Sequence, residues 1–175
     1  MEWRLYIMKI CPACGMPQMK ESAVCQYCKY DSEKPVSELS KTQIYELMAP
    51  YGFDRTADGG YIINSVKNIR DLALRGSVGV PHFVTEIGNG AYAYCKFISF
   101  IELPNGLQAI GENAFGGCRD LMEIFIPETV TRMGKAVFAD CYDLAEIRCA
   151  AKEKPEGWDD AWLDGCDAKV TWGGG

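Results

Sequence analysis

A segment of about 23 residues recurs three times in the C-terminal half of the chain. The copies read VTEIGNGAYAYCKFISFIELP, LQAIGENAFGGCRDLMEIFIP and VTRMGKAVFADCYDLAEIRCA, and they begin at Val84, Leu107 and Val130. Repeats of this length are typical of solenoids, because a unit this short cannot bury its own apolar face and has to stack on its neighbours. We therefore predict a short solenoid, an architecture that presents a surface and implies no particular chemistry.

Corresponding positions of the three copies carry side chains of similar size. The aligned sets are Ile87, Ile110 and Met133; Gly88, Gly111 and Gly134; Tyr92, Phe115 and Phe138; Cys95, Cys118 and Cys141; Ile98, Leu121 and Leu144; Ile101, Ile124 and Ile147; and Leu103, Ile126 and Cys149. The last two sets are two residues apart, so they lie on one side of a short strand. Parallel strands from successive units then form one sheet, whose layers are stable only as a stack.

The N-terminal segment CPACGMPQMKESAVCQYCKYD contains two C-x2-C pairs, formed by Cys11 and Cys14 and by Cys25 and Cys28. Two such pairs place four thiolates around one tetrahedral zinc ion. A segment of about 35 residues is too short for a hydrophobic core of its own, whereas structural zinc contributes about 10–16 kcal/mol to such peptides. We predict a structural Zn²⁺ site here, with a redox C-x-x-C as the alternative.

This segment resembles the zinc-ribbon modules found at the start of many bacterial multidomain proteins, over about Met8 to Asp31. The resemblance implies a small β fold around the metal, although Lys29 stands where a glycine is common in the second knuckle. Residues 1–7 are either an extension or an extra strand. We assign residues 1–31 to the zinc ribbon on this basis.

The residues that follow divide into a linker, a cap and the solenoid. The polar residues 32–40 are a linker. Residues 41–70 comprise a capping helix, which ends at Pro50, and a hairpin around Asp58, Gly59 and Gly60. Residues 71–175 are the solenoid. Its C-terminal cap is the degenerate unit KPEGWDDAWLDGCDAKVTW, in which Leu163 corresponds to Phe138.

The pattern I-G-x-x-A-F-x-x-C, followed by L-x-x-I-x-I-P and V-T-x-I-G, resembles the BspA-type leucine-rich repeat over about Tyr51 to Trp172. Two departures are the residues from Gly76 to Pro81, which lengthen the first coil, and Val137, which replaces the usual alanine. The resemblance implies a mainly β solenoid with a parallel sheet wall and short helical turns. It also implies binding of proteins or cell-surface ligands on one face, without a shared active site.

Outward positions of the predicted sheet form the candidate protein-binding face. They are Phe100, Glu102, Glu123, Phe125, Glu146 and Arg148, with Lys169 and Thr171 in the last strand. Exposed aromatic residues inside a polar rim often anchor interfaces. The alternative is a cross-strand ladder in which Phe100 and Phe125 are diagonal neighbours that cover each other.

Composition narrows the class of function. The net charge of -6 opposes nonspecific attraction to nucleic acid or anionic lipid. There is neither an apolar run of about 20 residues nor a secretion signal, and the nine cysteines favour reduced thiols, so we expect a cytoplasmic protein.

We predict no catalytic residues. The leading hypothesis is a nonenzymatic protein-interaction module; the alternatives are a nucleic-acid-associated or regulatory factor that uses the zinc ribbon, and self-association of solenoids.

Overall fold

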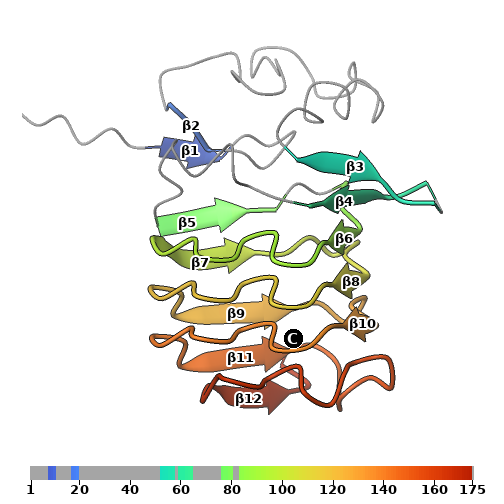
Figure 1. Ribbon diagram of the computed structural model, residues 1–175, viewed down its shortest axis with the longest axis vertical. Coiled ribbons are helices and arrows are strands. Elements are labelled where there is room, and N and C mark those ends of the chain that lie inside the picture. Colours follow the sequence, from blue (N-terminus) through green and yellow to red (C-terminus); the bar gives the residue numbers. More distant parts are fainter. Residues whose placement is uncertain are drawn as a thin grey trace, which may run out of the picture.

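The computed structural model of the 175-residue chain describes residues 8–10, 17–19, 52–57, 59–64, 76–80 and 83–174. Twelve strands and no helix occur within these ranges (Figure 1). Strand β1 (Met8–Ile10) pairs antiparallel with β2 (Pro17–Met19). The predicted capping helix and the predicted linker, residues 32–40, lie outside the described residues.

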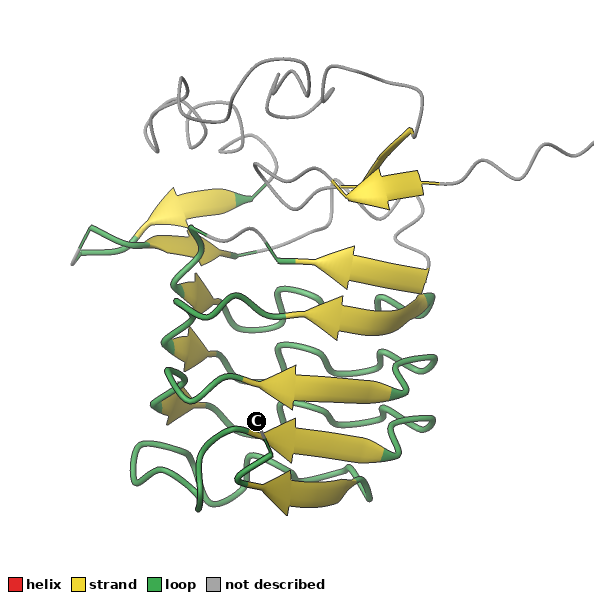
Figure 2. Ribbon diagram, turned by 180° about the vertical axis from the view of Figure 1, so that it is seen from behind, coloured by secondary structure: helices red, strands yellow, loops and turns green. Residues whose placement is uncertain are grey.

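Two sheets, each with five strands, build the solenoid (Figure 1). The long-strand sheet contains β5 (Gly76–Gly79), β7 (Ile98–Glu102), β9 (Glu123–Ile126), β11 (Glu146–Cys149) and β12 (Lys169–Trp172), all parallel. The short-strand sheet contains β3 (Phe53–Arg55), β4 (Tyr61–Ile63), β6 (Glu86–Ile87), β8 (Ala109–Ile110) and β10 (Arg132–Met133). Figure 2 shows the two sheets from behind as two columns of strands joined by loops.

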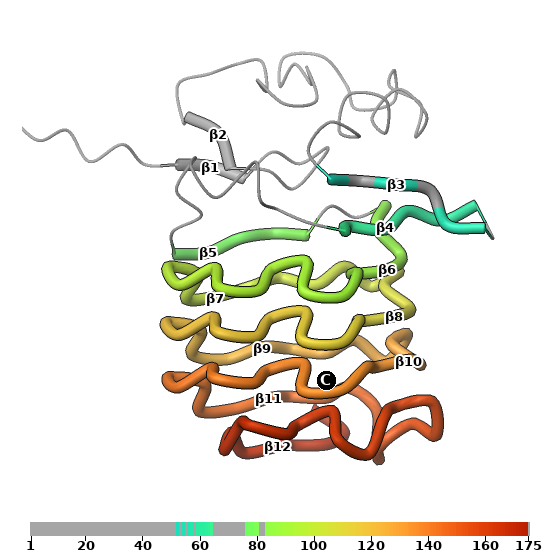
Figure 3. Tube along the Cα trace, viewed as in Figure 1, coloured from blue at the N-terminus to red at the C-terminus, as the bar shows by residue number. Residues whose placement is uncertain are grey.

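The register between strands follows the sequence repeat. Ile124 lies beside Ile101 on one side and beside Ile147 on the other. In the short-strand sheet, Ile110 lies between Ile87 and Met133. Equivalent residues therefore stack directly above one another, and successive coils run almost in parallel (Figure 3). The alignment predicted from the sequence is confirmed for these sets.

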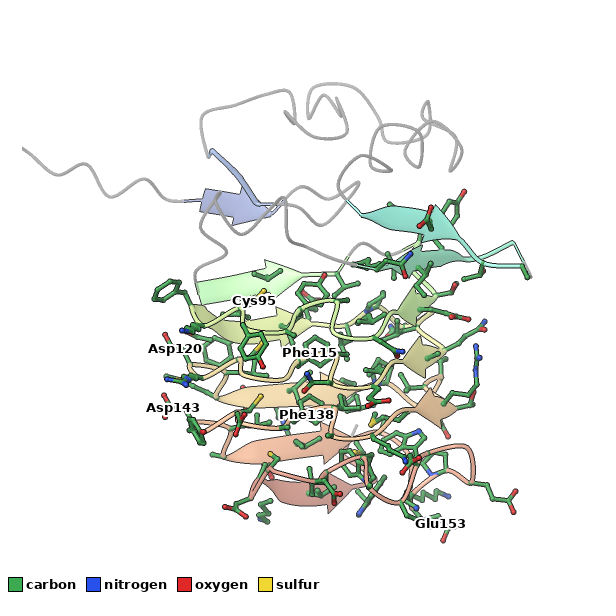
Figure 4. The ribbon with its side chains drawn as sticks, viewed as in Figure 1. Cys95, Phe115, Asp120, Phe138, Asp143 and Glu153 are labelled. Carbon is green, nitrogen blue, oxygen red and sulfur yellow. The ribbon has the colours of Figure 1, made fainter. Side chains whose placement is uncertain are left out.

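An aromatic ladder fills the interior between the two sheets. Ring centroids are 5.5 Å apart for Tyr92 and Phe115 and 5.6 Å apart for Phe115 and Phe138, and both pairs are stacked. Phe115 and Phe138 are at most 1% exposed and lie one above the other in Figure 4. Stacked aromatic pairs contribute about 0.5–1.5 kcal/mol beyond the burial of their area. The core is therefore one continuous column.

The C-terminal coil differs from the prediction in its register. Trp162, and not Leu163, continues the ladder, with its ring 6.2 Å from that of Phe138. The ring centroid of Trp158 lies 5.1 Å from that of Trp162, and Nε1 of Trp158 donates a hydrogen bond of 2.9 Å to the carbonyl oxygen of Val130. Met133 bridges to Trp158, 25 residues further on, whereas Ile147 pairs with Val170, 23 residues further on. The register therefore shifts within this coil, and counting residues back from Cys166 selects the wrong neighbour.

The connections between strands are turns, so the prediction of short helical turns is wrong for the described residues. Two equivalent positions of the repeat have positive φ, the first in three coils and the second in four. One set is Gly90, Asn113 and Ala136 (60°, 52° and 47°), and the other is Tyr94, Gly117, Asp140 and Gly165 (62°, 71°, 58° and 76°). A left-handed residue cannot continue a right-handed helix. Each turn therefore stops before it becomes a helix.

The first coil also departs from the prediction. Gly76 to Gly79 form strand β5, in which Val78 pairs with Ile101, so these residues belong to the repeat and do not lengthen the coil. The predicted hairpin is present, because β3 pairs antiparallel with β4. Both strands belong to the short-strand sheet, a second sheet that was not predicted: β3 is its edge strand and β4 pairs with β6.

Candidate protein-binding face

The outer face of the long-strand sheet carries the six predicted binding residues. In β9 and β11 buried residues alternate with intermediate or exposed ones, and in β7 Ile98 and Ile101 are buried whereas Phe100 and Glu102 are exposed. Ile101 and Ile124 are 6% and 1% exposed, whereas Phe100 and Phe125 are 41% and 37% exposed. The outward orientation predicted for the two phenylalanines is therefore confirmed.

Polar residues on this face interact along a diagonal between neighbouring strands. Arg148 Nη2 lies 3.2 Å from Glu123 Oε2, and Thr171 Oγ1 donates a hydrogen bond of 2.7 Å to Glu146 Oε1. Both pairs are 25 residues apart in the chain. Exposed ion pairs contribute only about 0–1 kcal/mol to stability. Their main consequence is to order the half of the face formed by β9, β11 and β12.

Phe100 and Phe125 lie on the same diagonal but form no aromatic ring contact with each other within the described chain. Each residue keeps more than a third of its surface exposed. The cross-strand ladder proposed as the alternative therefore does not remove these rings from solvent. Phe100 lies opposite Glu123 of the next strand, so each ring has a charged neighbour.

An exposed apolar residue beside this face, Met122, was not among the predicted binding residues. Met122 is 49% exposed, and its N–H donates a hydrogen bond of 3.0 Å to the carbonyl oxygen of Ser99, which places it beside strand β7. The equivalent positions in the other copies are Ser99 and Ala145, which are small. The sequence signal for Met122 was a large residue at a position where the other repeats have small residues. We name Phe100, Met122 and Phe125 the apolar patch.

The aligned cysteines lie inside the solenoid and act as packing residues. Cys118 Sγ and Cys141 Sγ donate hydrogen bonds of 3.2 Å to the carbonyl oxygens of Tyr92 and Phe115 in the preceding coil. Burial raises the pKa of Cys141 and of Cys149 to about 12. The thiols of Cys141 and Cys149 are therefore protonated at neutral pH. Those of Cys118 and Cys141 link one coil to the next.

No group of three or more His, Cys, Asp or Glu side chains able to hold a metal ion occurs in the described part of the chain. The predicted ligands Cys11, Cys14, Cys25 and Cys28 lie outside it. Likewise, none of the described segments contains a helix long and apolar enough to cross a membrane.

A shallow groove of about 550 Å³ lies over the short-strand sheet. Gly88, Gly111 and Gly134 form part of its floor. Its polar side chains are used within the fold, since Arg132 Nη2 lies 2.7 Å from Glu86 Oε1 and Asn89 Oδ1 accepts a hydrogen bond of 2.8 Å from the N–H of Glu112. Arg132 and Asn89 therefore serve contacts within the fold.

These features define a parallel β-solenoid of the leucine-rich-repeat class. Residues 62–155 match six copies of the BspA type Leucine rich repeat region. The chain therefore belongs to the BspA-type leucine-rich repeat family, as its repeat pattern indicated.

Crystal structures of two bacterial leucine-rich repeat proteins have a similar fold. A protein from Bacteroides capillosus is 23% identical, with 70% of this chain and 93% of that chain covered and a TM-score of 0.58. The leucine-rich repeat protein of T. pallidum is 21% identical, with 70% and 61% covered and a TM-score of 0.51. At these identities the likeness shows the fold alone. No curated protein matches the chain.

Proposed function

We propose that this chain is a nonenzymatic protein-interaction module that binds its partner through the outer face of the long-strand sheet. Leucine-rich repeat folds generally serve protein–protein interaction. The observation that carries the proposal is the apolar patch, in which Phe100 and Phe125 on the sheet, and Met122 immediately before β9, remain 37–49% exposed. Exposed apolar groups that are surrounded by polar residues are typical of interfaces.

The charges on this face favour a protein over a nucleic acid as the partner. Three glutamates, Glu102, Glu123 and Glu146, share the face with Arg148 and Lys169. Binding to nucleic acid depends on neutralising phosphates with lysine and arginine. A face with more carboxylates than cations does not supply that neutralisation.

Affinity capture with the full chain as bait tests this proposal. Bound proteins from a lysate of the source cell are compared by quantitative mass spectrometry for the wild type, for the double variant F100A/F125A and for Y142A. Tyr142 is 68% exposed and lies outside the apolar patch, so Y142A is the matched control. We expect F100A/F125A to lose partners that Y142A retains. Retention of every captured protein by F100A/F125A would exclude this face.

We further propose that Cys11, Cys14, Cys25 and Cys28 hold one structural zinc ion. The two C-x2-C pairs support this, because they supply four thiolates for a tetrahedral site. The antiparallel pairing of β1 with β2 adds support, since the residues that connect these strands include Cys11 and Cys14.

Metal analysis of the purified chain tests the zinc proposal. We expect about one zinc per chain in the wild type, loss of the metal in C25S, and retention in C166S. Cys166 lies in the last coil and belongs to neither C-x2-C pair, so it controls for removal of a thiol as such. A wild-type chain without zinc, or a C25S variant that keeps it, would contradict the proposal.

A further inference from the structure

Aromatic rings and carboxylates alternate over strands β7 and β9. Along β7, Phe100 and Glu102 both point outward, and along β9 Glu123 and Phe125 do so. Phe100 lies opposite Glu123, and continuing this register by two residues places Glu102 beside Phe125. The four side chains therefore form a checkerboard, in which each ring has carboxylates on its own strand and on the neighbouring strand.

The half of this checkerboard formed by Glu123 and Phe125 already has a cation beside it, the guanidinium of Arg148. Arg148 lies opposite Phe125, and its guanidinium reaches Glu123 at 3.2 Å. Arg148 therefore shows that this arrangement accommodates a guanidinium that pairs with an outward carboxylate.

The other half, around Phe100 and Glu102, has no such cation among the described residues. Its neighbours on β5 are Ser77, opposite Phe100, and Gly79, opposite Glu102. Both are small, and Ser77 is exposed, so its side chain does not cover the ring of Phe100. Within the described chain, the carboxylate of Glu102 has no hydrogen bond or ion pair, and the residue is exposed.

We infer that the partner presents a lysine or arginine beside apolar side chains, and that its cationic group pairs with Glu102 next to the ring of Phe100. The apolar neighbours of that cation cover Met122 and Phe125. This inference rests on the proposed function and names the chemistry of the partner segment. A cation that approaches a ring and a carboxylate together gains from both contacts, whereas an acidic segment would be repelled by Glu102 and Glu123.

Peptide selection on the immobilised full-length chain tests the inference. The probe is a phage-displayed library of random peptides of about 12 residues, and enriched sequences are synthesised and measured by fluorescence anisotropy. We expect lysine or arginine next to apolar residues in these peptides. We also expect E102Q and F100A each to weaken their binding by about fivefold or more. E153Q is the control, because Glu153 is an exposed carboxylate in the distant terminal coil (Figure 4).

The outcomes separate the inference from the proposed function. Peptides that lose affinity with F100A or F125A but carry no cation, or that bind E102Q as tightly as wild type, would overturn the inference and leave the proposed function in place. Selection that yields no peptide dependent on Phe100 or Phe125 would overturn both. Replacing the peptide's cation by glutamine should weaken binding to the wild type but hardly change binding to E102Q, which a merely structural role of Glu102 would not produce.

Discussion

Single residues at the left-handed turn positions show that the repeat accepts residues other than glycine where φ is positive. Gly90, Asn113 and Ala136 occupy equivalent places with φ between 47° and 60°. Glycine adopts this conformation without steric cost, and asparagine tolerates it better than most residues. Alanine has neither advantage, so Ala136 carries local strain that the surrounding coils have to offset.

Replacing this alanine tests the strain directly. We expect A136G to raise the free energy of unfolding by up to about 1 kcal/mol, because relief of the left-handed strain exceeds the entropy that glycine adds to the unfolded chain. A139G, at a position without positive φ, should instead lower it by about 0.5–1 kcal/mol. Urea unfolding measures both, and equal losses in the two variants would refute the strain argument.

At the scale of the element, the aligned glycines allow one coil to lie directly on the next. A Cβ added to Gly111 would lie 2.6 Å from the backbone nitrogen of Asn89 and 2.7 Å from the carbonyl carbon of Gly88. A Cβ on Gly134 would lie 2.5 Å from the backbone nitrogen of Glu112. Backbone atoms cannot move aside as the end of a flexible side chain can. These glycines are therefore required by close approach and not by φ.

A methyl group at this contact should force neighbouring coils apart. We expect G111A to lower the free energy of unfolding by about 1–3 kcal/mol, the usual cost of overpacking. G174A is the matched control, because a Cβ there would meet nothing within 4 Å. Chemical denaturation compares the two variants with wild type. A G111A chain as stable as G174A would mean that the coils separate easily.

For the whole molecule, stability is shared along the aromatic ladder. Phe115 contacts Tyr92 on one side and Phe138 on the other, and Phe138 contacts Trp162 in the last coil. Each layer therefore buries its neighbours, and no described coil has a core of its own. Repeat proteins of this kind unfold according to the coupling between adjacent units.

Removal of the Phe115 ring should consequently destabilise the last coil, which lies two coils away. We expect F115A to cost about 3–5 kcal/mol and to shift circular dichroism and tryptophan fluorescence together. Three tryptophans, Trp158, Trp162 and Trp172, report on the last coil. The fourth, Trp3, is replaced by phenylalanine in every sample so that only the last coil is observed. A fluorescence transition that stays at its wild-type midpoint would show that the coils unfold independently.

Local patterns were sufficient to predict the buried side of the long strands. Ile101 and Leu103 differ by two residues, and this spacing is enough to separate inward from outward positions. The two-residue strands β6, β8 and β10 are too short to show any alternation, so the second sheet could not be recognised in this way. Strand β5 could have been recognised, because Val78 and Val80 precede Ile101 and Leu103 by one repeat length.

The repeat in the chain was enough to establish that coils stack and which side chains enter the core, because apolar periodicity is a local property and burial follows from it. The identity of the neighbours on the surface depends on the register between coils. That register makes Phe100, Glu102, Glu123 and Phe125 a checkerboard, places Arg148 in one half of it, and puts Trp162 under Phe138. Such contacts join residues far apart in the chain, so they are settled only when all coils pack together.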